Sequence, residues 1–242
     1  MSPIEKEVNM LNLTQIKSKC STRLAGLHPV VLSAATLLIE RCYSSGVPIL
    51  ITQGLRTIAE QAALYAQGRT KPGVIVTNAK EGYSYHNYGL AIDFALLLPS
   101  GTAVSWDKCR DGDGDMTADW QEVVQQAKAL GFEWGGDWSS FKDYPHLQMT
   151  FGLTLAELRG GTKPSEGAIN AAYATIKARD AQSVEKVVTA VIQVNGVKVA
   201  DGILENGITY VPVRALAKAL GAKISYDSTT QTVKITSRYE EK

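Results

Sequence analysis

The sequence has few cysteines and no long apolar segment, which excludes several classes of protein. Only three cysteines occur among its 242 residues, Cys20, Cys42 and Cys109, and their spacing fits neither a CxxC zinc site nor a disulfide framework. No apolar run reaches the roughly 18 to 20 residues that cross a bilayer, and the opening MSPIEKEVNMLNLTQ lacks the basic start and apolar stretch of an export signal. We therefore expect free thiols, no membrane insertion and no signal for export.

An excess of charge of either sign is also missing. The 25 Lys and Arg residues and 24 Asp and Glu residues leave a formal net charge of +1. Such a balance does not attract nucleic acid or an anionic membrane over long distances. With 45% apolar and 20% charged residues, the composition is typical of a soluble globular protein and excludes disordered and collagen-like chains. We expect no nucleic-acid partner.

The length favours two domains, because an ordinary domain needs about 100 to 200 residues. Thr57 with Glu60 fits a capping box at the start of a helix, and Asp119 with Glu122 fits another. The expected helices of the first domain cover residues 29–46, 57–66 and 119–131. The expected strands cover residues 47–52, 89–98 and 146–151. This mixture predicts an α+β fold, with a small antiparallel sheet packed against helices.

The periodic pattern breaks at residues 160–166 (GGTKPSE), and residues 169–184 then have the composition of a polar connecting helix. The remaining sequence is rich in β-branched residues, with Asn195-Gly196 as a tight turn and a short helix behind Pro212. We expect a first domain over 1–160, a linker over 161–186, and a small β-rich domain with one short helix over 187–242.

Two of the three histidines lie in unusual surroundings. The segment SYHNYGLAID places His86 in a turn and Asp93 inside an apolar strand. An ionised carboxylate in such a strand must be paired or bound to a metal, and no Lys or Arg occurs between Lys80 and Lys108. His146 stands at the mouth of a later strand. Two histidines and one aspartate leave a fourth tetrahedral position open for water, which is typical of a catalytic zinc site.

Strand alternation supports this grouping. It places Asp93 on the same side of its strand as the small Ala91, which leaves room for a metal. It places His146 on the same side as Gln148. Asp143, three residues before His146, fits a general base that takes a proton from the attacking water and passes it to the leaving amine.

Each of these residues alone is more often a capping or hydrogen-bonded structural residue. Only the combination of His86, Asp93, Asp143 and His146 favours a metal site over that ordinary interpretation. The third histidine, His28, precedes a proline at a helix start and has no acidic neighbour, so we interpret it as structural.

The motif SYHNYGLAIDF followed by DYPH resembles the SxHxxGxAxD and (D/E)xxH signatures of the zinc D-Ala-D-Ala carboxypeptidase superfamily. The segments RTIAEQAALYAQGRT, PGVIVTNA and FEWGGDW are similar to its L-alanyl-D-glutamate endopeptidase branch, which comprises bacterial wall hydrolases and phage endolysins. The resemblance covers about Leu24 to Leu153.

This resemblance implies roles for five residues. Zinc would be bound by His86, Asp93 and His146, and Asp143 would be the base. Arg56 would bind or polarise the substrate, since a guanidinium fixed at a strand end suits a carboxylate or a scissile carbonyl. The alternative for Arg56 is a surface cation at a helix end.

An acidic loop is a candidate second metal site. Positions 1, 3, 5, 7, 9 and 12 of a calcium-loop pattern are occupied by Asp111, Asp113, Asp115, Thr117, Asp119 and Glu122. Gly114 would be a turn residue, but Met116 stands where an EF-hand has glycine. The alternative is a solvated loop whose Asp119 and Glu122 merely cap the following helix.

The C-terminal segment VNGVKVADGILENGITYVPVRALAKALGAKISYDSTTQTVKI resembles the small copper amine oxidase N-terminal-like, or stalk, domain of bacterial surface proteins. The resemblance covers roughly Val187 to Thr236. This segment has no His or Cys and therefore no good copper ligand set. We expect it to hold the enzyme on the wall, with a passive stability or oligomerisation module as the alternative.

The sequence as a whole predicts a zinc metallopeptidase that cleaves peptidoglycan stem peptides between L-Ala and D-Glu. The alternatives are a D,D- or L,D-carboxypeptidase on the same scaffold and an inactive wall-binding protein. The presence of all four zinc-site and base residues argues against the inactive protein. A wall substrate without an export signal indicates an endolysin that stays in the cytoplasm until release, although a trimmed secreted enzyme would look identical.

Overall fold

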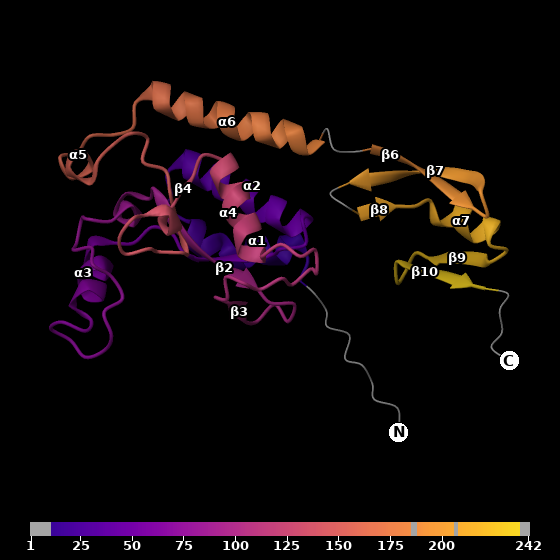
Figure 1. The fold of residues 1–242 in the computed structure, drawn as a ribbon, viewed down its shortest axis with the longest axis horizontal. Helices are drawn as coiled ribbons and strands as arrows, with labels where there is room; N and C mark the ends of the chain where they lie inside the picture. The colour runs from indigo at the N-terminus through magenta and orange to yellow at the C-terminus, as the bar shows by residue number, and fades with distance from the viewer. Residues whose placement is uncertain (1–10, 185–187, 206–207, 238–242) are drawn as a thin grey trace. The chain divides into compact units, whose positions relative to one another are not determined.

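The computed structural model describes residues 11–184, 188–205 and 208–237, and the chain forms two compact units, Met1–Asp180 and Ala181–Lys242 (Figure 1). Two expectations fall outside the described residues in whole or in part. They are the lack of an export signal, which concerns residues 1–10, and the end of the expected linker at residues 185–186.

Helices of the first unit begin where local signals predict. The capping box of Thr57 and Glu60 is confirmed at the start of α3, and the backbone N–H of Val30 donates to Nδ1 of His28 at the start of α2. His28 is therefore a structural capping residue, as expected. The helices are α1 Leu13–Leu24, α2 Pro29–Ser44, α3 Ile58–Ala66, α4 Asp119–Ala129, α5 Leu155–Arg159 and α6 Glu166–Val184, and short 3-10 helices span η1 Tyr85–Tyr88 and η2 Gly135–Asp137.

An antiparallel sheet of five strands lies beside these helices. Its order is β1-β2-β5-β4, with β3 also paired to β2. The strands are β1 Ile49–Gln53, β2 Ala91–Leu97, β3 Val104–Ser105, β4 Glu133–Trp134 and β5 His146–Gln148. The α+β fold expected from the sequence is confirmed, and β2 is the central strand because it pairs with three neighbours.

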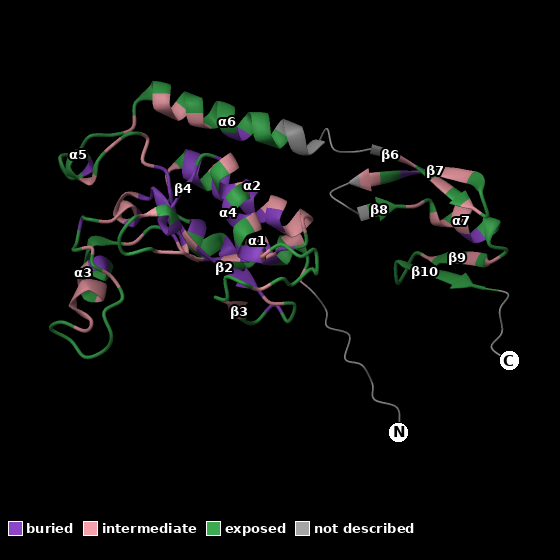
Figure 2. Cartoon of the chain, viewed as in Figure 1, coloured by how far each residue is buried: buried purple, intermediate pink, exposed green. Residues whose placement is uncertain are grey.

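One face of the sheet carries the core. Ile92 of β2 pairs with Leu147 of β5, and Phe94 lies against Trp120 of α4 with ring centroids 4.6 Å apart. Helices α1 and α2 contact β1, and α2 also contacts α4. Figure 2 shows buried residues concentrated in these elements. Since side chains alternate along a strand, the opposite face is left for Asp93 and His146.

Two local expectations are wrong. Helix α4 has Ala118 rather than Asp119 at its N-cap, because the Asp119 carboxylate instead accepts the backbone N–H of Gly112 at 2.7 Å. Strand β5 ends at Gln148 rather than Phe151, because Phe151 adopts a left-handed backbone conformation with φ of 52°. In both places a contact or turn outside the local pattern decides the structure.

Helix α6 lies along the core of the first unit. Ile176 is buried in that core, and Ile169 and Ala172 pack against it. Arg41 of α2 donates from Nη1 to the backbone carbonyl of Arg179 at 3.1 Å. Much of the segment expected as a linker is therefore a helix that packs on the first unit.

The second unit is small and mostly β-structure. Its elements are β6 Val188–Val194, β7 Val197–Glu205, β8 Ile208–Tyr210, α7 Val213–Ala219, β9 Lys223–Asp227 and β10 Thr232–Thr236. The turn at Asn195 and Gly196 is confirmed, with φ of 51° and 80°, as is the helix behind Pro212. Among its described apolar residues, Ala217 is buried, whereas Tyr226 and Ile235 are exposed.

The cysteines are free thiols, as expected. Cys20 and Cys42 are buried, and burial raises the pKa of both thiols, while Cys109 is exposed. Within the described part of the chain, we find no helix with the length and apolar character needed to cross a membrane.

Candidate metal centre

Three candidate ligands meet on the face of the sheet opposite the core. His86 lies in η1, Asp93 in β2 and His146 at the start of β5, and the register of β2 and β5 pairs Asp93 directly with His146. Gly89 ends η1 in a left-handed conformation with φ of 67°, and a side chain there would lie 2.8 Å from the carbonyl of Gly26. Glycine thus allows the sharp turn that brings His86 back beside β2.

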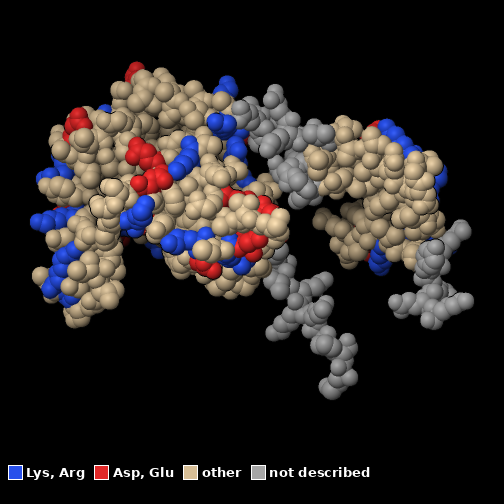
Figure 3. Space-filling view, in the orientation of Figure 1, with Lys and Arg blue, Asp and Glu red and all other residues tan. Residues whose placement is uncertain are grey.

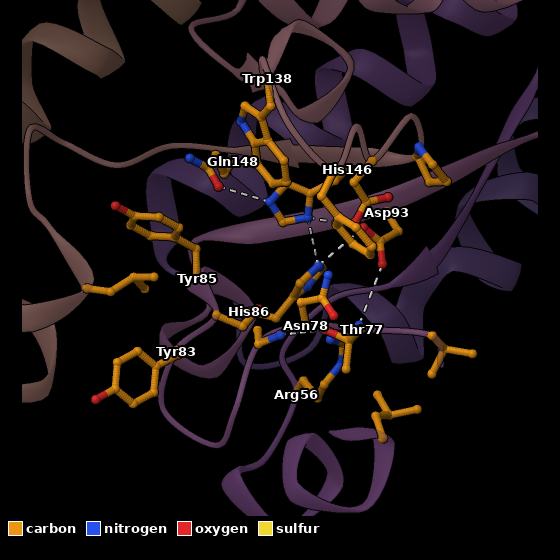
Figure 4. A pocket seen from close by; sticks show the side chains of 18 of the residues that line it. Arg56, Thr77, Asn78, Tyr83, Tyr85, His86, Asp93, Trp138, His146 and Gln148 are labelled. Atoms are coloured by element: carbon orange, nitrogen blue, oxygen red, sulfur yellow. Dashed lines mark hydrogen bonds and ion pairs between the residues drawn. The ribbon is translucent and has the colours of Figure 1, made fainter. Parts of the chain in front are cut away.

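The three ligand atoms form a tight triangle (Figure 4). Oδ1 of Asp93 lies 3.2 Å from Nε2 of His86 and 3.3 Å from Nδ1 of His146. The two ring nitrogens are 3.1 Å apart. Both histidines are buried, so these distances reflect side chains held in place by packing.

The proton on His86 can be assigned from its partner. Its Nδ1 lies 2.8 Å from the backbone carbonyl oxygen of Gly54, which can only accept a hydrogen bond. Nδ1 therefore carries the proton, and Nε2 directs a lone pair toward Asp93 and His146. Acceptors this close repel one another unless a cation, either a proton or a metal, lies among them.

The electrostatics favour positive charge at this position. Burial acts to raise the pKa of Asp93, but when protons take the place of a metal among the three groups, the charge of His86 and the hydrogen bonds from both rings outweigh burial and hold that pKa well below its usual range. Burial acts to lower the pKa of His146, but its hydrogen bond to Asp93 and the charge of that carboxylate raise it overall. Two imidazoles and one carboxylate are a donor set that zinc prefers, so these residues fit a zinc ion.

A cavity of about 610 Å³ opens over the triangle, and Asp143 lies on its wall. The backbone N–H of Asp143 donates to the carbonyl of Gly135 at 3.1 Å, and its own carbonyl accepts the N–H of His146 at 3.3 Å. A side chain at Gly135 would lie 2.4 Å from that carbonyl, so glycine is required there. Burial, and then the charge of Asp93, raise the pKa of the Asp143 carboxyl.

Arg56 lines the same cavity and is not a surface cation, since only 13% of its side chain is exposed. Its Nη2 lies 3.6 Å from Oδ2 of Asp93, and its Nη1 donates to Oε1 of Gln61 at 2.9 Å. Its Nε is buried without a hydrogen-bond partner among the described residues. The guanidinium is thus fixed beside the three ligands.

Three further residues of the site have no role in the sequence-based prediction. Gln61 is fully buried and its amide also donates to the carbonyl of Ala79 at 2.7 Å. The Trp138 ring lies 5.2 Å from that of His146, and Gln148 accepts from the same imidazole. Gln61 and Trp138 lie in two of the segments that carry the family resemblance, and strand alternation places Gln148 on the side of His146, but none of these signals assigned a role to the residue.

The acidic loop gathers its carboxylates as a calcium loop would. Ligand atoms of Asp111, Asp113 and Asp115 lie within 4.8 Å of one another, as do those of Asp113, Asp119 and Glu122. Met116, at the position of the EF-hand glycine, adopts φ of 73°, and its backbone N–H donates to Asp111. Thr117 uses its backbone N–H to donate to Asp115.

Other contacts in the loop do not require a metal. The Asp119 carboxylate already pairs with Arg110 at 3.3 Å, and exposed acidic groups often cluster without an ion. Burial and the neighbouring carboxylates raise the pKa of Glu122 to about 7, and its Oε1 has no hydrogen-bond partner among the described residues.

The charged surface is mixed. On the face shown in Figure 3, Lys and Arg side chains are interspersed with Asp and Glu side chains over the first unit, and much of the visible second unit is uncharged. This distribution agrees with the near-zero net charge of the sequence.

Comparisons with known families match both parts of the chain. Residues 77–149 match the family described as D-alanyl-D-alanine carboxypeptidase, and residues 193–241 match the copper amine oxidase N-terminal domain. The first match contains His86, Asp93, Asp143 and His146 and leaves out Arg56.

Individual relatives match the first unit. The peptidoglycan L-alanyl-D-glutamate endopeptidase CwlK of Bacillus subtilis (strain 168) is 55% identical over 123 residues, covering 51% of this chain and 73% of the relative. The L-alanyl-D-glutamate peptidase of Listeria phage A118 is 37% identical over 119 residues, covering 49% of this chain and 36% of the relative. The crystal structure of the Serratia marcescens L-Ala D-Glu endopeptidase ChiX is 29% identical, with a TM-score of 0.39, covering 56% of this chain and 89% of that one.

Proposed function

This chain belongs to the family of peptidoglycan L-alanyl-D-glutamate endopeptidases, and we propose that its first unit hydrolyses the L-Ala–D-Glu bond of peptidoglycan stem peptides with the help of zinc. The observation that carries the proposal is the convergence of His86, Asp93 and His146 in one cavity with Asp143 and Arg56. This cavity brings together a metal donor set, a candidate base and a fixed cation.

Zinc would be held by Nε2 of His86, Nδ1 of His146 and the carboxylate of Asp93. When bound, it supplies Lewis acidity, which polarises a carbonyl and lowers the pKa of a water molecule to about 7. The protein holds the donors close before any metal arrives, so little reorganisation is needed on binding.

Asp143 is the proposed general base. It takes the proton from the attacking water and passes it to the nitrogen of D-Glu as the peptide bond breaks. Its backbone bonds to Gly135 and His146 keep its carboxyl on the cavity wall. Trp138 packs on His146 and, as a large apolar side chain on the same wall, excludes bulk water from the reacting groups.

Arg56 is the proposed substrate-binding cation. Its hydrogen bond to Gln61 and its ion pair with Asp93 fix the plane of the guanidinium, which lines the cavity and can donate there to an oxygen acceptor. The acceptor is the scissile carbonyl or a carboxylate of the stem peptide, both of which gain from a preorganised charged donor.

Mass spectrometry of the fragments released from purified peptidoglycan tests this function. An L-alanyl-D-glutamate endopeptidase leaves L-Ala on the lactyl group of the glycan and releases peptides that begin with D-Glu. Release of a single terminal amino acid would instead indicate the alternative, a D,D- or L,D-carboxypeptidase on the same scaffold. No released fragment at all would favour an inactive wall-binding protein.

A calcium ion in the acidic loop is a second proposal of ours. It is supported by the gathered carboxylates and by the unpartnered Oε1 of Glu122. The pKa of Glu122 is raised by burial and then by the neighbouring carboxylates, and a cation would relieve both effects. Because Glu122 starts α4 and that helix packs on the core, calcium would act on stability rather than on the reaction.

For the second unit we infer a role in holding the enzyme on the cell wall, where the substrate lies. The support is its match to the copper amine oxidase N-terminal domain and the lack of His and Cys for a metal of its own. A passive role in stability or oligomerisation is the alternative.

A further inference from the structure

The ring of His146 can bind a metal through Nδ1 only if its single proton lies on Nε2. A neutral imidazole carries one proton, and the partner of the other nitrogen decides which nitrogen has it. Nε2 of His146 lies 2.9 Å from Oε1 of Gln148. If that oxygen stays in place, it accepts a hydrogen bond from the N–H of Nε2 and leaves the lone pair of Nδ1 facing Asp93.

A glutamine amide does not by itself fix this arrangement, because its oxygen and nitrogen can exchange places by rotation. The hydrogen bond of the amide nitrogen on its other side fixes the orientation of the amide. Nε2 of Gln148 donates to Oε2 of Glu133 at 3.0 Å, and a carboxylate only accepts. Rotation would turn the amide oxygen against this carboxylate and the amide N–H against His146, which would move the ring proton to Nδ1 and block metal binding.

The sheet positions the three residues of this hydrogen-bond relay, Glu133, Gln148 and His146. Glu133 of β4 and Gln148 of β5 are direct cross-strand partners, and His146 precedes Gln148 by two residues on the same face. The second carboxylate oxygen of Glu133 accepts the hydroxyl of Thr150 at 2.7 Å. Gln148 is 6% exposed whereas Glu133 is exposed, so the relay runs from the protein surface to a buried ring.

His86 offers the contrast within the same site. Its proton is fixed by the backbone carbonyl of Gly54, which no substitution of a side chain removes. The proton of His146 depends on two side chains instead. The position of the ring proton is therefore fixed by the backbone in His86 and by side chains in His146. Only the proton of His146 can be moved by substituting a side chain.

We propose that Glu133 is a positioning residue: through the amide of Gln148 it keeps Nδ1 of His146 free to bind the metal. This inference rests on the proposed zinc site. It gives a role to a surface carboxylate that touches neither the three ligands nor Asp143 in any described contact. It also predicts that a substitution 13 positions before the ligand His146 alters metal affinity.

Three variants of the full-length protein test the proposal. Glu133→Gln is isosteric but can donate as well as accept, so it releases the amide of Gln148, and zinc affinity should fall by about 10- to 100-fold. The double variant Glu133→Gln with Gln148→Glu reverses the pair, because the new carboxylate accepts from both His146 and the new amide, and it should regain most of that affinity. Thr150→Val removes the other donor to Glu133 but keeps the amide bond, so it should bind zinc like the wild type.

Two measurements separate positioning from a general structural effect. Competition with a chromogenic chelator gives the zinc dissociation constants, and ¹⁵N spectra of the imidazoles without added metal report which nitrogen of His146 carries the proton. Wild-type zinc affinity in Glu133→Gln would overturn the inference, as would a double variant as weak as the single one. An equal loss in Thr150→Val would also overturn it, since that loss would indicate local destabilisation.

The outcome can be distinguished from failure of the proposed function. A wild-type protein that binds no zinc contradicts the metal site, and the ¹⁵N spectra then still decide whether Glu133 controls the proton of His146. A wild-type protein that binds zinc tightly, with unchanged affinity and unchanged ¹⁵N shifts in Glu133→Gln, contradicts the positioning role alone.

Discussion

Asp93 and His146 are direct partners across strands β2 and β5, and their atoms Oδ1 and Nδ1 lie 3.3 Å apart. The register of the sheet therefore sets the spacing of two proposed ligands. A slip of one residue in either strand would turn the ligand of that strand toward the apolar core. His86 joins them from the turn that leads into β2.

Removal of the metal should abolish activity. We expect chelator to stop hydrolysis of a stem peptide and zinc to restore it, and His86→Ala to lose bound zinc in metal analysis, because one of three ligands is gone. His28→Asn is the matched control, since asparagine keeps the helix cap and the residue lies outside the site. Full activity in excess chelator after complete metal removal would refute the mechanism.

Replacement of the base should separate chemistry from metal binding. Asp143→Asn should keep zinc but lower kcat by about 10²- to 10⁴-fold, the usual contribution of positioned acid–base catalysis. Asp137→Asn is the control, because Asp137 is an exposed carboxylate nearby that pairs with Lys128. If Asp143→Asn turns over near the wild-type rate, another group is the base.

Substitution of Arg56 should weaken the reaction without removing the metal. Lysine cannot reproduce the hydrogen bond to Gln61 and the ion pair with Asp93 at once, so Arg56→Lys should lose kcat/KM by about 10²-fold. Zinc content should stay at the wild-type level. Arg69→Lys is the control, because Arg69 is an exposed arginine on the loop after α3. An unchanged kcat/KM in Arg56→Lys would remove Arg56 from the mechanism.

Calcium should raise the melting temperature, and Asp113→Asn with Asp115→Asn should remove that effect, while Glu166→Gln, an exposed control, should keep it. The gain should be larger at pH 8 than at pH 5. The pKa of Glu122 is about 7 in the folded protein and about 4.5 when unfolded. The folded state therefore holds the extra proton between these values, and its stability falls as the pH rises through that window.

Calcium offsets the fall in folded-state stability only where Glu122 is ionised. The calcium-dependent rise in melting temperature should therefore be larger at pH 8 than at pH 5. Calorimetric titration that detects no binding at millimolar calcium would establish the solvated-loop alternative.

Truncation should reveal where the catalytic unit ends. A chain that stops after residue 180 should cleave a soluble stem peptide at the full-length rate but act more slowly on intact walls, since it has lost the proposed wall-holding unit. A chain that stops at Gly160 should melt earlier, because the loss of buried Ile176 alone costs about 1.5 to 3 kcal/mol. Equal stability of the two truncated chains would show that α6 contributes nothing to the first unit.

Much of the fold follows from local sequence, and so do the candidate ligands. The capping box at Thr57 and the turn at Asn195 depend on residues within a few positions, so their patterns predict them correctly. The alternation that puts Gln148 beside His146 is equally local. These features need no knowledge of the distant chain.

The features that could not be predicted depend on distant partners. The cation beside Asp93 is Arg56, 37 positions earlier, although the sequence near Asp93 contains no Lys or Arg. The pairing of Glu133 with Gln148 requires the register of β4 and β5. Asp119 has a correct local capping pattern, but its contact with Gly112 overrides it.

The packing of α6 has a consequence for how such enzymes can be recombined. Because this helix covers the core with Ile169, Ala172 and Ile176, the joint that tolerates exchange of a C-terminal module lies beyond the helix. A gene fusion made there would carry the whole hydrolase together with the packed part of α6 and could attach it to a different surface-binding module. A fusion made at the glycine-rich segment before α6 would separate the hydrolase from part of its own interior.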